Sequence, residues 1–175
     1  MTIPPIDSIK YGFPLTLCGN PEDGGLLKTT VLLVEDSKVQ KLMNERILHK
    51  AGYTVLNAAD GEEALRLARE TIPDVVLLDM LLPKLGGREV MLALRGDPST
   101  ARIPVIFFSS LSQANELKLA NEGAAGYFSK SRLAENPAVG EKELIQLIEA
   151  IVQKSRKGSQ PEKLKSSRGA VAGAD

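Results

Sequence analysis

The sequence has very few of the residues that build disulfides, cysteine-based metal centres or aromatic binding platforms. Its 175 residues include one cysteine, one histidine and no tryptophan, and aromatic residues make up only 4%. A single cysteine, Cys18, excludes an internal disulfide and argues against a cysteine-based zinc site. A free thiol suits a reducing compartment, so we expect a cytoplasmic protein. The only histidine, His49, lies at a predicted helix end, which does not favour a phosphohistidine carrier.

Long apolar runs and a net charge of one sign are also missing. No apolar stretch approaches the roughly 20 residues that cross a bilayer, and the N-terminus lacks the pattern of a signal peptide, so we expect no membrane contact. The formal net charge is zero, so the chain as a whole shows no preference for nucleic acid. Residues 154–175 do carry six Lys or Arg against Glu162 and Asp175. We interpret this segment as a solvated, disordered basic tail.

Apolar residues make up 43% of the chain, enough for one domain with a mainly aliphatic core. Residues 1–28 are rich in proline and are predicted to form a poorly structured N-terminal extension. Within it, Tyr11, Phe13 and Leu15 could dock on the domain or on a partner. The folded domain should then cover residues 29–153.

Strand and helix patterns alternate along this domain. Strands are predicted at about 29–34, 53–58, 74–79, 104–108 and 125–129. Helical patterns follow the capping signals at Ser37, Asp60 and Ser112, and cover about 88–94 and 141–152. The first helix has four apolar residues on one face, which we expect to pack on the sheet. These residues are Val39, Leu42, Met43 and Ile47.

Strands that alternate with helices predict an α/β fold, with a doubly wound five-stranded parallel sheet and helices on both faces. Ligands of such folds bind at the carboxyl ends of the strands. That edge would gather Glu35 and Asp36 after the first strand, Asp79 after the third and Ser109 after the fourth. Carboxylates about 4 Å apart repel by roughly 4 kcal/mol per pair at an effective dielectric near 20, so the group needs a cation, a proton or a function. Taken alone, Glu35-Asp36 is more typical of a strand end and helix cap.

Four stretches resemble the receiver domain of two-component response regulators, in the order and spacing of that family. They are Val31–Ser37 (VLLVEDS), Asp79–Pro83 (DMLLP) with Gly87 beyond it, Ile103–Ser110 (IPVIFFSS) and Gly123–Lys130 (GAAGYFSK). The resemblance covers about residues 29–153. It implies a flavodoxin-like sheet of strand order 2-1-3-4-5, in a single-domain, CheY-like response regulator.

The resemblance also implies a phosphorylation site. Asp79 would be the nucleophile that forms an aspartyl phosphate. Lys130 would bring a positive charge to the phosphoryl oxygens, and Ser109 would donate a hydrogen bond to them. The metal would be Mg²⁺, a hard cation that prefers oxygen ligands. Its implied ligands are Glu35, Asp36, Asp79 and the backbone carbonyl of Leu81.

Phosphorylation in this family drives a switch. Ser109 and Lys130 would be drawn inward, and Tyr127 on the fifth strand would change rotamer. An unknown downstream protein would bind the altered surface, formed by the fourth helix, fifth strand and fifth helix. The phosphoryl group would come from a histidine kinase or phosphotransfer protein, and a homodimer is a further family possibility. The chain would be a signalling protein rather than an enzyme, apart from Mg²⁺-dependent self-phosphorylation and autodephosphorylation at Asp79.

The sequence departs from the family pattern in three places. Ser109 stands where threonine is commoner, Ser131 follows Lys130 where proline is common, and the stretch 131–140 is longer than expected. Other functions therefore stay open. A degenerate receiver would bind partners without phosphorylation, although the intact acidic group and Lys130 argue against it. An aspartyl phosphohydrolase usually needs a second acid two residues after its nucleophile, where this chain has Leu81. A P-loop enzyme is excluded because no matching glycine-rich motif occurs.

Overall fold

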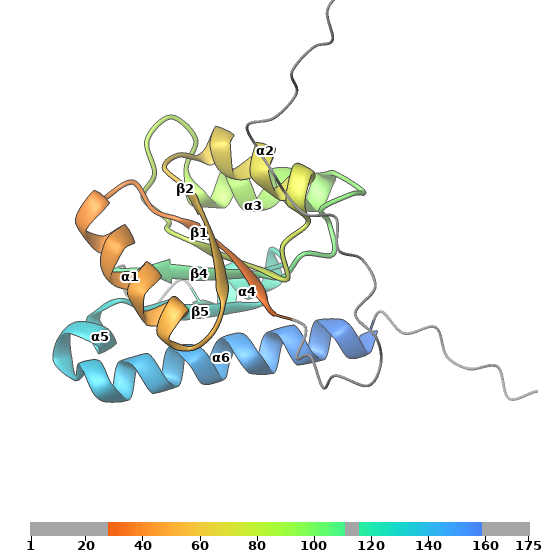
Figure 1. Cartoon of the computed structure of the whole chain (residues 1–175). Coiled ribbons are helices and arrows are strands. Elements are labelled where there is room, and N and C mark those ends of the chain that lie inside the picture. Colours follow the sequence, from red (N-terminus) through yellow and green to blue (C-terminus); the bar gives the residue numbers. More distant parts are fainter. Residues whose placement is uncertain (1–27, 111–115, 159–175) are drawn as a thin grey trace, which may run out of the picture.

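Short runs of β-branched and aliphatic residues form a parallel sheet. The computed structural model describes residues 28–110 and 116–158, and within them five strands lie side by side (Figure 1). They are β1 (Thr30–Val34), β2 (Thr54–Ala58), β3 (Val75–Leu78), β4 (Val105–Ser109) and β5 (Gly126–Ser129). All neighbouring pairs are parallel and the order is β2-β1-β3-β4-β5, which confirms the predicted topology.

Six helices occur in the described part of the chain. They are α1 (Lys38–Lys50), α2 (Gly61–Thr71), α3 (Gly87–Gly96), α4 (Glu116–Asn121), α5 (Ser131–Glu135) and α6 (Pro137–Gly158). Helices α1 and α6 lie on one face of the sheet, and α2 and α3 lie on the other (Figure 1). The doubly wound α/β prediction is therefore confirmed. None of the described helices combines the length and the apolar character that crossing a bilayer requires.

Alternate residues of each strand enter two separate cores. Val34 and Leu78 belong to the core under α2 and α3, whereas their neighbours Leu33 and Leu77 belong to the core under α1 and α6. The helices add Val90, Met91 and Leu94 to the first core, and Leu48, Leu144 and Ile148 to the second. Because both faces of the sheet are covered, β3 and β4 are buried at every position, and their residues are apolar except for Ser109 at the end of β4.

Helix α1 packs on the sheet with a different side from the predicted one. Of the four apolar residues expected there, Val39, Leu42 and Met43 are 70%, 68% and 61% exposed. The buried residues of α1 are Asn44 and Leu48. Gln40, Asn44 and Leu48 recur every four residues, so they share the helix face that meets the domain. On this face Asn44 and Leu48 are buried, and the Gln40 side chain accepts a hydrogen bond from Lys130 Nζ at 2.8 Å.

Residues predicted to form a loop and a tail belong to the last two helices. The stretch 131–140 contains α5 and the start of α6, where Asn136 Oδ1 accepts a hydrogen bond from the Val139 amide at 3.3 Å. Pro137 suits the first turn because its missing N–H would have no helical partner there. Helix α6, and not α5, corresponds to the fifth helix expected from the sequence.

Helix α6 also continues beyond the predicted domain end at residue 153. The prediction of disorder is wrong for residues 154–158, which are helical. In this extension Arg156 donates to Asp74 Oδ1 at 2.8 Å, which connects the last turns of α6 to the residue before β3. The predicted N-terminal extension over residues 1–27, the tail over residues 159–175 and the predicted helix start at Ser112 lie outside the described residues.

Helix α3 begins directly against the backbone that follows β3. The Gly87 amide donates to Met80 O at 3.1 Å. A Cβ atom on Gly87 would lie 2.1 Å from Asp79 O and 2.9 Å from Met80 Cα, much closer than van der Waals contact. The missing side chain at Gly87 therefore allows α3 to start beside Asp79.

We predict that Gly87→Ala lowers the free energy of unfolding by about 3 kcal/mol, because the Asp79 backbone must move to make room. Urea unfolding measures the loss. Gly96→Ala in the same helix is the matched control, because a Cβ atom there meets nothing within 4 Å. The control should be neutral or stabilising by about 0.5 kcal/mol. Equal stability of the two variants would contradict the close approach.

Candidate functional site

Three charged residues follow directly on strand ends at the carboxyl edge of the sheet. The Glu35 amide donates to the last carbonyl of β2, and the Asp79 amide donates to the last carbonyl of β1, each at 3.1 Å. The Lys130 amide donates to the last carbonyl of β4 at 2.9 Å. These bonds continue the strand pairing by one residue. They fix the backbone from which each charged side chain extends.

The Lys130 ammonium lies between two buried carboxylates. Its Nζ donates to Glu35 Oε2, to Asp79 Oδ2 and, at 2.8 Å, to Gln40 Oε1. Glu35 is 1% exposed and Asp79 is 8% exposed, so water screens their repulsion weakly. The ammonium offsets that repulsion, and the three groups together keep a formal charge of −1. The structure therefore brings Glu35, Asp79 and Lys130 together, as predicted.

Aromatic residues support Lys130 from the core. Its Nζ lies 5.3 Å from the ring centroid of Phe108 on β4. Phe108 in turn packs against Phe128, with ring centroids 5.9 Å apart and a tilt of 33°. The face of an aromatic ring attracts a cation, so this floor adds to the pull of the carboxylates. The position of the ammonium is consequently determined from two sides.

The remaining predicted residues occupy the same edge in different environments. Asp36 follows Glu35 and is exposed, whereas Ser109 at the end of β4 is fully buried. The Leu81 amide donates to Asp79 Oδ1 at 3.1 Å, which orients the carboxylate, and the Leu81 side chain is 64% exposed. Tyr127 on β5 is half-buried beside the core under α2 and α3. The structure thus describes where these four residues lie, and their roles stay predictions.

The donors at this edge suit a hard divalent cation in kind. Within residues 28–110 and 116–158, no three Asp, Glu, His or Cys side chains are grouped as a metal site. Glu35 and Asp79 contact Lys130 instead, while Asp36 is exposed. Mg²⁺ binds through one or two carboxylates and keeps several waters, so it does not require a closed cage of protein ligands. Carboxylate and carbonyl oxygens at this edge are therefore compatible with Mg²⁺.

The loop after β3 is tied to the start of α2. Asp60 accepts a hydrogen bond from the Glu63 amide at 2.9 Å and one from Lys84 Nζ at 2.6 Å. The Glu63 amide, followed by Lys84, lowers the pKa of Asp60, and Asp60 raises the pKa of Lys84. Lys84 has a left-handed backbone with a φ of 66°. Because exposed ion pairs contribute little stability, we interpret this pair as positioning the turn between Asp79 and α3.

Gln40 is a member of this group that the sequence analysis did not identify. Its sequence context showed only a capping-box pattern with Ser37. Ser37 is confirmed as the cap, since its Oγ accepts from the Gln40 amide at 3.4 Å, but the Ser37 amide donates to Glu35 Oε1 at 3.3 Å and not to Gln40. A residue one turn into a helix that follows a strand lies above the carboxyl edge of the sheet. The position of Gln40 one turn after the first strand was the sequence feature from which its place in this group could have been predicted. The side chain of Gln40 links α1 to Lys130 and hence to β5.

We predict that Lys130→Ala lowers the free energy of unfolding by about 3 kcal/mol at neutral pH, because two buried carboxylates lose the cation between them. Urea unfolding measures the change. Lys50→Ala is the control, because it removes an exposed ion pair of 3.1 Å with Glu141 and should cost about 0.5 kcal/mol. Added Mg²⁺ should restore more stability to Lys130→Ala than to the wild type. A Lys130→Ala chain as stable as the control would argue against the shared ammonium.

Comparisons with known proteins agree with this architecture. Among curated proteins, the polar-differentiation response regulator DivK of Brucella anthropi is 33% identical over 102 residues, which cover 58% of this chain and 83% of DivK. A putative response regulator from Chloroflexus aurantiacus has a solved structure with a TM-score of 0.64 and 28% identity, over 72% of this chain and 98% of that one.

A second solved structure is the receiver domain of the sensor histidine kinase PA1611 from Pseudomonas aeruginosa, with a magnesium ion coordinated in its active site cleft. It has a TM-score of 0.63 and 27% identity, over 72% of this chain and 98% of that domain. Residues 31–136 of this chain match the response regulator receiver domain family. The match includes the strand ends that carry Glu35, Asp79 and Lys130. The chain therefore belongs to the family of response regulator receiver domains of two-component systems.

Proposed function

We propose that this receiver domain is a cytoplasmic, phosphorylation-dependent signalling switch with Asp79 as its phosphoacceptor. One observation carries the proposal: the Asp79 carboxylate lies at the carboxyl edge of the sheet, hydrogen-bonded to an ammonium that it shares with a second acid. A carboxylate at such an edge can attack phosphorus while the cation receives the transferred charge. Receiver domains in general are signalling switches rather than enzymes, and they act with histidine kinases or phosphotransfer proteins.

The proposed reaction exchanges one bond to phosphorus. An Asp79 oxygen attacks the phosphoryl group of a phosphohistidine, the N–P bond breaks as the O–P bond forms, and the leaving imidazole nitrogen takes up a proton. Lys130 changes its partner from the carboxylate to the phosphoryl oxygens, and the Ser109 hydroxyl donates a further hydrogen bond. Positioning and charge neutralisation supply most of the rate in phosphoryl transfer. The buried ammonium beside Asp79 supports this assignment.

The proposal includes Mg²⁺ at the same edge. Its protein ligands would be the carboxylates of Asp36, Asp79 and Glu35 and the backbone carbonyl of Leu81. Bound there, the ion supplies positive charge to the phosphoryl oxygens. Asp36 is exposed beside the buried Glu35, so one ligand of the pair faces solvent, from which a hydrated ion arrives.

Phosphorylation would alter the surface formed by α4, β5 and α6. Ser109 and Lys130 end strands that pair with each other, so a pull on both acts on the β4–β5 edge of the sheet. Tyr127 pairs with Phe107 in this register and is only half-buried, which leaves it room to change rotamer. A downstream protein, or a second copy of the chain, would bind this surface.

We predict that acetyl phosphate and Mg²⁺ together add one phosphoryl group to the wild-type chain, as measured by intact mass. Asp79→Asn should add none, because an amide is not a nucleophile of this kind, and Asp79→Ala should add none either. Phosphorylation of the Asp36→Asn variant should be slower but not abolished, because the proposed role of Asp36 is to bind the metal ion. A phosphoryl group retained by Asp79→Asn would place the acceptor elsewhere.

A phosphorylation-independent scaffold is the alternative function. A scaffold would show no response to the phosphoryl analogue beryllofluoride with Mg²⁺. If the chain is a switch, the same addition should shift the amide signals of β4, β5 and α6. A steady turnover of phosphomonoesters would instead favour a phosphohydrolase.

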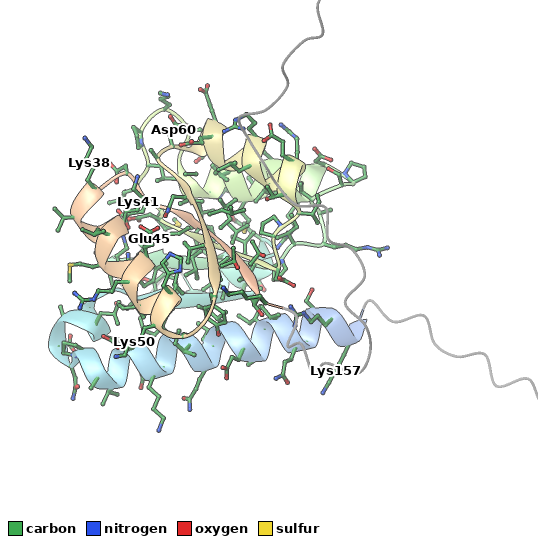
Figure 2. The ribbon with its side chains drawn as sticks, viewed as in Figure 1. Lys38, Lys41, Glu45, Lys50, Asp60 and Lys157 are labelled. Carbon is green, nitrogen blue, oxygen red and sulfur yellow. The ribbon has the colours of Figure 1, made fainter. Side chains whose placement is uncertain are left out.

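Helix α1 offers a surface on which the phosphodonor would dock. Its first turns expose Val39, Leu42 and Met43. Basic Lys38 and Lys41 lie on the same helix (Figure 2). Large exposed apolar patches mark interaction sites, and this one adjoins Gln40, whose side chain contacts Lys130. A donor helix with apolar and acidic residues would fit here and present its phosphohistidine to Asp79.

We predict that the double variant Leu42→Asp, Met43→Asp loses at least tenfold in the rate of transfer from the cognate phosphohistidine donor, because one buried aliphatic contact is typically worth more than about 1.4 kcal/mol. Its rate with acetyl phosphate should stay unchanged, since that donor needs no docking surface. Leu92→Asp on α3, which is 42% exposed, is the control for added surface charge. An equal loss with both donors would show damage to the site rather than to docking.

A further inference from the structure

A groove runs along the amino-terminal edge of the sheet, opposite to the phosphorylation site. It consists of two hollows of about 450 and 420 Å³ that share Val152 and Arg156 of α6. The first extends to Ile72 and Arg102, and the second extends to Gly52 and Lys28. We call these six residues the amino-edge groove. Its members come from five separate regions of the chain, and all belong to the described residues.

Two side chains at this groove are not accounted for by packing within the described residues. Ile72 is the left-handed C-cap of α2, with a φ of 46° and its amide donating to Ala68 O at 3.0 Å, and its side chain is 51% exposed and packs in neither core. Tyr53 lines the second hollow, and its buried hydroxyl has no hydrogen-bond partner among the described residues. Burial, and then Glu149, raise the pKa of Tyr53 to about 12. Both features suggest that this edge has another covering element.

We propose that residues 9–17 of the same chain dock in the amino-edge groove. In this segment every second residue is apolar, namely Ile9, Tyr11, Phe13, Leu15 and Leu17. An extended chain with this alternation has one apolar face, and its other face carries Lys10, Gly12, Pro14 and Thr16. Pro14 cannot donate to a strand ladder, so the segment suits a groove lined by side chains better than a place inside the sheet.

The point at which the described chain begins favours this occupant. Lys28 is both the first described residue and a lining residue of the groove. The twelve residues 16–27 between Leu15 and Lys28 can span up to roughly 40 Å when extended. Five strands spaced by about 4.8 Å make an edge of only about 20 Å. A tether of this length keeps the segment at a millimolar effective concentration, so modest contacts are enough to hold it.

Charge also favours the N-terminal segment. Residues 1–27 contain Asp7, Glu22 and Asp23 against Lys10, which gives them a formal charge of −2. The two hollows are lined by Lys28, Arg102 and Arg156 against Asp74 and Glu149, which gives the lining a formal charge of +1, and Arg156 is already paired with Asp74. Residues 159–175 follow α6, whose residues Val152 and Arg156 line the groove, but they carry a formal charge of +1 and have only Leu164 and Val171 as large aliphatic residues. Residues 1–27, with acidic residues on both sides of the 9–17 segment, therefore have a charge opposite to that of the groove lining, and residues 159–175 do not.

This docking goes beyond the proposed switch and does not depend on it. The groove lies at the edge opposite to Asp79, so the segment leaves the phosphorylation site open. The segment would cover Ile72 and the end of α6, which no other described element covers. Failure of phosphorylation would leave this inference intact, and failure of docking would leave the switch intact.

The lone cysteine allows a direct test in the full chain. A nitroxide spin label on Cys18, next to the docking segment, should broaden the amide signals of Gly52, Ile72 and Ser99 relative to a diamagnetic label. Signals of Ser37 and Gly87 at the opposite edge should keep their intensity. Weak and equal broadening at both edges would overturn the proposal, and so would broadening centred on α1. In a mixture of spin-labelled chains without isotope and isotope-enriched chains without spin label, broadening arises only between molecules. Broadening of the groove signals in that mixture would assign the groove to a second copy and would overturn the proposal.

Two pairs of variants separate docking from unfolding. Phe13→Ser with Leu15→Ser should abolish the broadening at Ile72, whereas Lys10→Ser with Thr16→Ser, on the other face of the segment, should preserve it. Arg102→Glu should weaken the broadening and Arg102→Lys should not, because Arg102 is exposed and contributes its charge. Unchanged broadening in Phe13→Ser with Leu15→Ser would refute the docked segment. Each variant keeps the domain core intact, so the amide spectrum itself verifies folding.

Discussion

The ammonium of Lys130 lets two buried carboxylates share one edge of the sheet, and the rest of the site depends on it. Glu35 directly follows β1, Asp79 follows β3 and Lys130 follows β5, and the third residue that Lys130 contacts, Gln40, lies on α1. One cation thus connects segments up to 95 residues apart in sequence. Because the cluster keeps a formal negative charge, a further anionic group can enter only with additional positive charge. This balance links the geometry of the site to the chemistry of the proposed phosphoryl switch.

Much of this arrangement follows from short-range sequence patterns. Uninterrupted aliphatic runs predict strands that are covered on both faces, and the helical patterns between them predict parallel pairing. Since the carboxyl ends of parallel strands share an edge, Glu35, Asp79, Ser109 and Lys130 could be placed together without coordinates. Their common edge depends only on strand direction and order, which the four family-like stretches also imply. Individual ligand and switch roles depend on finer geometry and remain predictions.

Features set by distant contacts could not be predicted in the same way. Apolar periodicity assigned Val39, Leu42 and Met43 to the packed face of α1, but the helix buries Asn44 and Leu48, on the face from which Gln40 contacts Lys130. Local composition suggested disorder from residue 154, whereas Arg156 pairs with Asp74, which lies 82 residues earlier. Local sequence does not show such partners, because the composition of a lysine- and serine-rich segment does not reveal whether a distant carboxylate lies next to it in the fold.

Helix α6 has a mechanical consequence beyond its packing. Its 22 residues make one uninterrupted helix about 33 Å long, from Pro137 beside the short helix α5 to Gly158 past the opposite side of the sheet. Three of its residues, Leu144, Ile148 and Val152, are anchored in the core at intervals of four. Such a rod cannot tilt at one end without displacing the other. A force on the basic end of α6 would therefore also act on its other end, next to α5, the helix that directly follows Lys130.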